Sequence, residues 1–182
     1  EVIGTDKFSM GPKVEEYEKQ FASLFGSKYG VMCSSGSTAN LIMVASLFFS
    51  KNPKLQAGDE IIVPAVSWST TYFPLQQYGL NLKFVDIDID TLNYNLVDLE
   101  SAITSKTKAI MIVNLLGNSN NFNIINGLIK DKDIVVIEDN CESMGAKLDG
   151  KFTGTFGLMG TFSSFFSHHI ATMEGGMVVT DD

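Results

Sequence analysis

Small and hydroxyl-bearing residues cluster at Ser34-Ser35-Gly36-Ser37-Thr38, directly before a mainly apolar helical pattern. Backbone N–H groups at the start of a helix attract anions, and small side chains let a phosphate group approach them closely. The same residue types also cap helices without any ligand, so this segment alone leaves both interpretations open. It does not form a nucleotide-binding P-loop, because the lysine of that motif is absent.

Two further segments place an aromatic ring and carboxylates after apolar runs typical of strands. Trp68, the only tryptophan, could stack on a flat ligand ring, although a single tryptophan more often belongs to a core. Asp139 and Glu142 follow the apolar run that ends at Ile137. A buried carboxylate needs a partner, so Asp139 either caps the next turn or pairs with a protonated heterocycle nitrogen.

Both histidines, His168 and His169, lie in the segment 160–176. Imidazole titrates near neutral pH, so one of them could serve as a general base, with a packed or exposed histidine as the alternative. Adjacent side chains in an extended stretch point in opposite directions. The two histidines and Glu174 also lack the helical spacing of a metal site, so no metal is expected.

Alternating helical and strand-like hydrophobic patterns must position these segments. Helices are expected at 14–25, 37–50, 69–78, 97–103 and 124–130. Strands are expected at 29–33, 60–63, 82–85, 109–113, 134–137, 161–166 and 177–180. Apolar strands separated by helices indicate an α/β fold with a mostly parallel sheet between helices. Ligands of such folds bind at the carboxyl ends of the strands, where the polar segments fall.

Composition restricts the class of protein. The 182 residues are 45% hydrophobic and carry a net charge of −8, which fits one globular domain. None of the basic residues is arginine, so a nucleic-acid partner is not expected. The longest mainly apolar run, 41–49, is far below the roughly 20 residues of a membrane span. Cys33 and Cys141 lie far apart and do not indicate a disulfide framework, which favours a cytoplasmic location.

The segments together resemble the DegT/DnrJ/EryC1/StrS family of sugar aminotransferases, which is related to aspartate aminotransferase. The similarity covers essentially the whole chain and includes Gly11-Pro12-Lys13-Val14-Glu15, Gly58-Asp59-Glu60, Phe84-Val85-Asp86-Ile87-Asp88, Ile137-Glu138-Asp139 and Glu174-Gly175-Gly176. It implies an aspartate-aminotransferase-like fold (PLP fold type I). Residues 1–182 would then form the cofactor-binding large domain, with a smaller C-terminal domain outside this sequence and a homodimeric assembly.

The resemblance also implies a role for each segment in binding pyridoxal 5′-phosphate or pyridoxamine 5′-phosphate. Trp68 would stack on the ring of the cofactor. Asp139 would bond to its pyridine nitrogen, and Glu142 would lie near the ring's 3-hydroxyl group, where many family members have glutamine. The phosphate contacts would be made by Gly36, Ser37, Thr38 and Ser163.

One position departs from the usual family pattern. In most members, a lysine six residues before the Glu-Gly-Gly block holds the cofactor covalently. Here that position is His168, and no lysine follows Lys151. The sequence therefore resembles the pyridoxamine-phosphate-dependent sugar 3-dehydratases, in which histidine replaces lysine, and among them the members that act on GDP-linked sugars. His168 would be the catalytic base, and His169, which aligns where asparagine is common, would point elsewhere.

This subgroup implies a reaction and partners. The enzyme would remove the C3 hydroxyl group of a nucleotide-linked 4-keto-6-deoxy sugar, with L-glutamate as amino donor, in the synthesis of deoxysugars such as colitose of lipopolysaccharide O-antigen. One alternative is an ordinary PLP-dependent sugar aminotransferase, which would need the missing lysine. Another is a catalytically silent binding protein with the same fold, against which the presence of Asp139, Trp68 and Ser163 argues.

Overall fold

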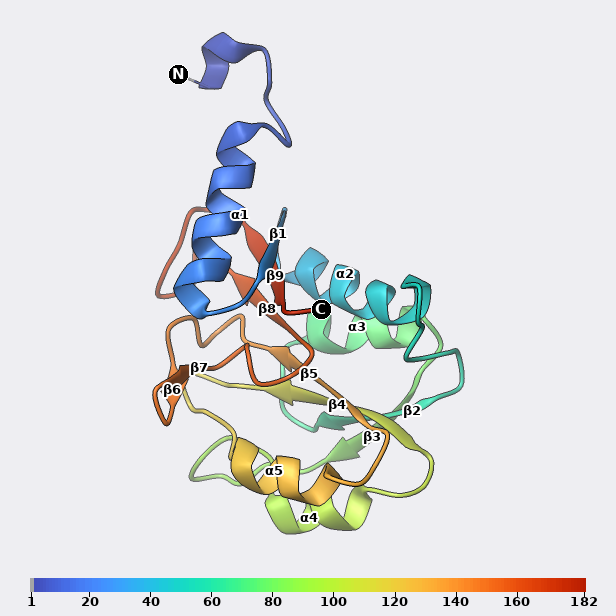
Figure 1. Cartoon of the computed structure of the whole chain (residues 1–182). Coiled ribbons are helices and arrows are strands. Elements are labelled where there is room, and N and C mark those ends of the chain that lie inside the picture. The colour runs from blue at the N-terminus through green and yellow to red at the C-terminus, as the bar shows by residue number, and fades with distance from the viewer. Residues whose placement is uncertain (1) are drawn as a thin grey trace.

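A seven-stranded sheet forms the centre of the protein in a computed structural model that describes residues 2–182 (Figure 1). The strands of this sheet lie in the order β1-β9-β8-β5-β4-β2-β3. Their bounds are β1 (Tyr29–Cys33), β2 (Glu60–Pro64), β3 (Asn81–Val85), β4 (Thr107–Val113), β5 (Val135–Asp139), β8 (Met159–Ser163) and β9 (Gly176–Thr180). Two short strands, β6 (Lys147–Leu148) and β7 (Lys151–Phe152), pair with each other in a separate hairpin.

Most of the sheet is parallel. Strands β8, β5, β4, β2 and β3 run in one direction, whereas β9 is antiparallel to both of its neighbours, β1 and β8. The carboxyl ends of the five parallel strands therefore lie at one edge of the sheet. Since α/β folds bind ligands at this edge, it is the place where the site is expected.

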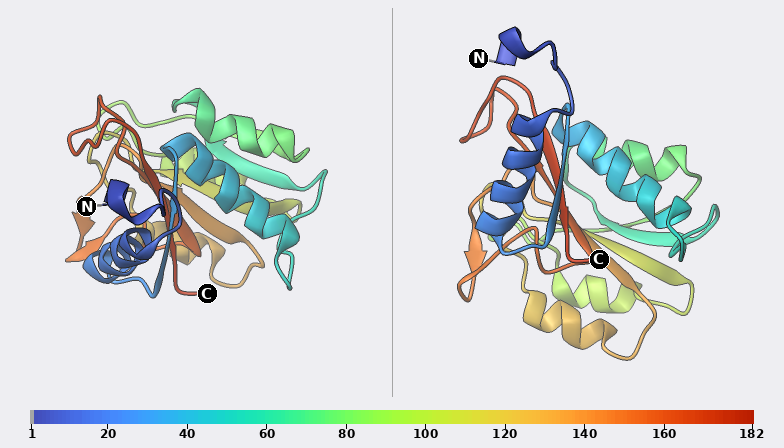
Figure 2. Two further views of the ribbon diagram at one scale, coloured as in Figure 1. Left: turned by 90° about the horizontal axis from the view of Figure 1, so that it is seen from above. Right: turned by 45° about the horizontal axis from the view of Figure 1, so that its top comes forward.

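Helices cover both faces of the sheet (Figures 1 and 2). A short 3-10 helix at Val2–Thr5 precedes them. The α-helices are α1 (Pro12–Phe25), α2 (Gly36–Phe49), α3 (Ser69–Gln77), α4 (Leu96–Ala102) and α5 (Phe122–Ile129). Helices α2 and α3 pack on one face, and α1, α4 and α5 pack on the other.

The continuously apolar strands are explained by burial on both sides. In β2, Ile61 packs into the core beneath α2 and α3, while Ile62 packs with Leu99 of α4 on the opposite face. Side chains alternate between the faces of a strand, so two covered faces require apolar residues at successive positions. Each fully buried side chain of this size contributes about 1.5–3 kcal/mol.

Helix α1 closes the face of the sheet next to β8 and β9. Its Phe21 and Phe25 contact Phe162 of β8, with ring centroids 5.2 and 4.7 Å apart. Met177 of β9 belongs to the same buried cluster. These contacts hold β8, whose last residue, Ser163, lies at the ligand-binding edge.

The predicted α/β fold with a mostly parallel sheet between helices is confirmed. The strand expected at 161–166 was placed wrongly, because β8 spans Met159–Ser163. Ser164 still donates in register to the Gly175 carbonyl opposite it, but from Phe165 on the chain forms a turn, in which the His168 N–H donates to the Phe165 carbonyl. Within residues 2–182, no helix combines the length and apolar character needed to cross a membrane.

Candidate active site

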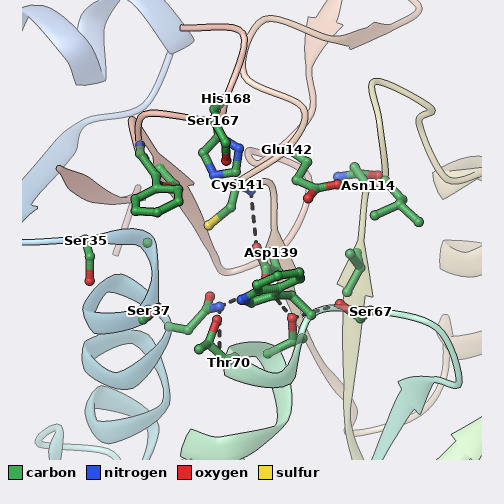
Figure 3. A pocket seen from close by; sticks show the side chains of 18 of the residues that line it. Ser35, Ser37, Ser67, Thr70, Asn114, Asp139, Cys141, Glu142, Ser167 and His168 are labelled. Atoms are coloured by element: carbon green, nitrogen blue, oxygen red, sulfur yellow. Dashed lines mark hydrogen bonds between the residues drawn. The ribbon is translucent and has the colours of Figure 1, made fainter. Parts of the chain in front are cut away.

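A cavity of about 350 Å³ lies at the carboxyl ends of the parallel strands. Its walls come from the start of α2, the start of α3 and its preceding loop, the segments after β4 and β5, the end of β8, and the loop between β8 and β9. In the view of Figure 3, Asp139 lies near the centre, with His168 and Ser167 above it and Ser37 and Thr70 below. The cavity therefore collects polar groups from segments far apart in the sequence.

The start of α2 is held by a capping box. The Thr38 N–H donates to Ser35 Oγ at 3.2 Å, and the Ser35 N–H donates to Thr38 Oγ1 at 2.9 Å. Ser35, Gly36 and Ser37 line the cavity, whereas the Thr38 hydroxyl is engaged in the cap and Thr38 is not among the lining residues. The free N–H groups of the first helical turn make this wall an anion-binding surface.

Gly36 permits a close approach of α2 to the end of β8. A Cβ atom built on Gly36 would lie 2.6 Å from Cβ of Ser163 and 2.8 Å from Sγ of Cys141. Any side chain at this position would push the helix start away from Ser163. The small residue therefore keeps the N–H groups of α2 and the Ser163 hydroxyl on one wall of the cavity.

Asp139 ends β5 and is 6% exposed. Its Oδ2 accepts hydrogen bonds from Asn40 Nδ2 and Thr71 Oγ1, both at 2.8 Å, and its Oδ1 accepts one from the Cys141 N–H at 3.2 Å. A carboxylate is costly to bury unless donors compensate for the lost water. These three donors supply that compensation and fix the carboxylate at the cavity wall.

The neighbouring Glu138 has a structural role on the opposite face of the sheet. Its carboxylate accepts from the N–H groups of Gly154, Phe156 and Gly157 and from Asn114 Nδ2. Burial raises the pKa of Glu138, and these four donors oppose that rise only in part. Strand alternation thus separates two adjacent carboxylates into one that organises a loop and one that faces the cavity.

Trp68 precedes α3, lines the cavity and is 71% exposed. A large aromatic ring left open beside buried polar groups is typical of a ligand-stacking surface. The structure places this tryptophan outside the core, which was the alternative left open by the sequence.

His168 lies on the loop 164–175, which joins β8 to β9. This loop is closed at its base, because the Thr172 N–H donates to the Ser164 carbonyl at 2.9 Å and the two hydroxyl groups of these residues lie 2.6 Å apart. His168 lines the cavity, and its ring lies in a T-shaped arrangement with that of Phe165, with ring centroids 6.1 Å apart. His169 instead contacts the Met144 carbonyl through Nε2 at 2.7 Å.

A second cavity of about 580 Å³ adjoins the first. Glu142, Ser167 and His168 line both cavities, whereas His169 lines only the second. The imidazole of His168 thus lies where a ligand in the first cavity and a molecule in the second could both reach it.

The structure brings seven of the eight candidate residues from the sequence to one cavity. They are Gly36, Ser37, Trp68, Asp139, Glu142, Ser163 and His168. It adds the donors to Asp139, Asn40 and Thr71, which the sequence reasoning missed. The one sequence signal for Asn40 was a single amide within an otherwise apolar helical stretch.

Among residues 2–182, no group of three or more His, Cys, Asp or Glu side chains could hold a metal ion.

A family model described as the DegT/DnrJ/EryC1/StrS aminotransferase family matches residues 1–182. This chain belongs to that family. A GDP-4-keto-6-deoxy-D-mannose 3-dehydratase from Yersinia pseudotuberculosis is 69% identical over 181 residues, which cover 100% of this chain and 46% of the relative. The structure of the E. coli GDP-4-keto-6-deoxy-D-mannose-3-dehydratase with bound hydrated PLP matches with a TM-score of 0.97 and 67% identity, over 100% of this chain and 46% of that chain.

Another solved structure, a GDP-4-keto-6-deoxymannose-3-dehydratase with a trapped PLP-glutamate geminal diamine, also matches with a TM-score of 0.97 and 67% identity. The match covers 100% of this chain and 47% of the chain in that structure. The chain therefore spans about half the length of these relatives. Its fold is that of the DegT/DnrJ/EryC1/StrS aminotransferases, in agreement with the resemblance found in the sequence.

Proposed function

We propose that this chain is the cofactor-binding large domain of an enzyme that uses pyridoxamine and pyridoxal 5′-phosphate. The proposed reaction removes the C3 hydroxyl group of a nucleotide-linked 4-keto-6-deoxy sugar, specifically GDP-4-keto-6-deoxy-D-mannose, the sugar in the names of the relatives. One observation carries the proposal: among the described residues, the cavity wall includes His168 and no lysine, and it includes every other residue expected to contact the cofactor except Thr38.

The residues of the cavity fit such a cofactor. The first turn of α2 with Ser163 offers N–H and hydroxyl donors to a phosphate group, and Gly36 leaves room for them to converge. Trp68 offers an open aromatic face. The buried Asp139 carboxylate offers an acceptor to a protonated ring nitrogen, and half-buried Glu142 lies on the same wall.

When bound, the cofactor would supply an amine for the C4 ketone of the sugar and a ring that accepts electrons. Asp139 would hold the ring nitrogen protonated, which strengthens that electron acceptance. His168 would remove a proton from the cofactor's C4′ carbon and so allow the C3 hydroxyl group to leave as water. Hydrolysis of the resulting amino sugar would release the 3-deoxy-4-keto sugar and ammonia, and the cofactor would be left in its aldehyde form. Unlike lysine, His168 cannot attach to that aldehyde, so it stays available to the amino donor.

Further parts of the proposal concern partners and location. L-glutamate would restore the amine form of the cofactor, which is supported by the PLP-glutamate adduct in a relative. The assembly would be a homodimer, as the resemblance to the family implies. The enzyme would act in the cytoplasm, where the two free cysteines, Cys33 and Cys141, would stay reduced.

The test is a His168→Asn variant assayed with GDP-4-keto-6-deoxy-D-mannose and L-glutamate, with His169→Asn as the matched control. General-base catalysis contributes about 10²–10⁴-fold, so His168→Asn should lower turnover by at least about 10²-fold while cofactor binding is retained. His169→Asn should keep turnover within a few-fold, because His169 contacts the Met144 carbonyl outside the first cavity. Equal turnover of His168→Asn and the parent protein would show that the assigned role of His168 is wrong.

A spectroscopic experiment separates the alternatives. Absorption spectra of the purified protein with pyridoxal phosphate would be recorded before and after borohydride, and then with glutamate. A cofactor band that borohydride does not attach to the protein, and that glutamate converts to the amine form, supports the dehydratase. Covalent attachment to a lysine would favour an aminotransferase, and the absence of any cofactor band would favour a silent binding protein.

A further inference from the structure

A buried set of hydrogen-bond donors surrounds one oxygen atom of Asp139. Oδ2 accepts from Asn40 Nδ2 of α2 and from Thr71 Oγ1 of α3, each at 2.8 Å. Asn40 is 1% exposed and Thr71 is 0% exposed. Both side chains are therefore shielded from water, and removing either donor would leave the carboxylate under-compensated at that oxygen.

The direction of these bonds is fixed by a second layer of contacts. Thr161 Oγ1 donates to Asn40 Oδ1 at 2.7 Å, which turns the NH₂ group of Asn40 toward Asp139. The single hydroxyl proton of Thr71 goes to Asp139, so Ser67 is the donor in the 2.8 Å contact between Ser67 and Thr71. Two chains of donors therefore end on the same oxygen, Oδ2.

The other oxygen, Oδ1, has spare accepting capacity. Among residues 2–182, the one hydrogen bond to Oδ1 comes from the Cys141 N–H, at 3.2 Å, whereas a carboxylate oxygen can accept two. With Oδ2 occupied by two short bonds, a ligand in the cavity would meet Oδ1. The network thus distinguishes the two oxygens: Oδ2 is bonded to protein donors, and Oδ1 can accept a hydrogen bond from a ligand.

We propose that Asn40 and Thr71 are positioning residues for the cofactor: by occupying Oδ2, they orient Asp139 so that Oδ1 meets the protonated ring nitrogen. This inference rests on the proposed function. Asn40 lies on α2, whose first turn provides the phosphate wall, and Thr71 lies on α3, which directly follows Trp68. The contacts to the phosphate, the ring face and the ring nitrogen are therefore linked through α2, α3 and one carboxylate.

The experiment measures the ring nitrogen directly. Purified protein is loaded with pyridoxal phosphate carrying ¹⁵N in its ring, and the ¹⁵N chemical shift and the cofactor Kd are measured. The variants are Thr71→Val and Asn40→Leu, which remove a donor while keeping similar volume, and Thr71→Ser, which restores the hydroxyl group. The control is Thr107→Val, because Thr107 is also buried and donates to a carboxylate, that of Glu60, at 2.8 Å.

Thr107 lies at the amino end of β4, at the opposite edge of the sheet from the cavity. Thr71→Val and Asn40→Leu should each raise Kd about tenfold, the scale of one hydrogen bond to a charged group, and move the ¹⁵N shift toward that of an unprotonated ring. Thr71→Ser should restore both values, and Thr107→Val should change neither.

The outcomes separate this inference from the function on which it rests. Parent-like Kd and ¹⁵N shift in both Thr71→Val and Asn40→Leu would overturn the positioning role while leaving the cofactor site intact. A general loss of affinity in Thr107→Val as well, with an unchanged ¹⁵N shift throughout, would show a merely structural effect and also overturn it. A parent protein that binds no cofactor, or binds it with an unprotonated ring, would overturn the cofactor role of Asp139 and with it this inference.

Discussion

Replacing Gly36 with alanine sets two physical effects against each other. Alanine is favoured over glycine within helices by at most about 1 kcal/mol, so helix propensity alone predicts a more stable protein. Close packing predicts the reverse, because the new Cβ atom would lie 2.6 Å from Cβ of Ser163 and 2.8 Å from Sγ of Cys141. Separations of this kind force helix α2 or strand β8 to shift.

The magnitudes favour the packing effect. Overpacking a tight site costs about 1–3 kcal/mol, which exceeds the propensity gain. Gly36→Ala should therefore lower the unfolding free energy by about 1–2 kcal/mol, and the melting temperature by about 2–8 °C for a domain of this size. Cofactor affinity should fall as well, because the start of α2 would move away from Ser163.

Gly127 in α5 provides the matched control, since nothing lies within 4 Å of a Cβ atom built there. Gly127→Ala should raise the unfolding free energy by about 0.5–1 kcal/mol without changing cofactor affinity. Both variants would be measured by thermal unfolding and by titration with pyridoxal phosphate. The reasoning is refuted if Gly36→Ala stabilises the protein as much as Gly127→Ala does and leaves the affinity unchanged.

Two further variants test the buried polar groups outside the cavity. Glu138→Gln would set an amide NH₂ against backbone N–H donors and should lower the unfolding free energy by about 1–3 kcal/mol at neutral pH. Burial raises the pKa of Glu138 above its ordinary value of 4.5, so this group favours folding most below pH 4.5, and its contribution should decline as pH rises through the folded-state pKa. Denaturant unfolding over a pH series checks this, and a contribution that grows with pH would contradict it. Tyr94→Phe removes the 2.8 Å bond from the buried Tyr94 hydroxyl to the Met111 carbonyl and should cost about 1 kcal/mol in the same assay, so an unchanged unfolding free energy would contradict the predicted loss.

The fold could be predicted largely from hydrophobic pattern, because strands buried on both faces leave continuous apolar runs such as that of β4. The ends of the individual helices and strands were harder to predict from the sequence. Phe165 and Phe166 made the sequence look strand-like up to position 166, yet β8 ends at Ser163, and beyond the in-register bond from Ser164 to Gly175 the chain enters the loop that the Thr172 N–H closes on the Ser164 carbonyl. That closure depends on Thr172, eight positions away, which the local hydrophobic pattern does not reveal.

The site was predictable where one residue type has few chemical uses. A carboxylate at the end of a buried strand and a tryptophan after another strand made Asp139 and Trp68 candidates, the family resemblance favoured a ligand role over a structural one, and both residues line the cavity. Asn40 and Thr71 were missed because each sits in a helix as an ordinary polar residue, and their task appears only when α2 and α3 meet β5. Thr38 shows the reverse case, since its hydroxyl group serves the helix cap that its sequence context also allowed.

The loop that carries His168 has a consequence for how this architecture can change its chemistry. The bonds that close its base join Ser164, Thr172 and Gly175, and none of them involves the imidazole of His168. The side chain at position 168 therefore makes none of the hydrogen bonds that close the loop. Under the proposed function, a lysine that holds the cofactor and a histidine that moves a proton could be exchanged at this position while the bonds that close the loop are kept, so the reaction could change without a change in the stability of the loop.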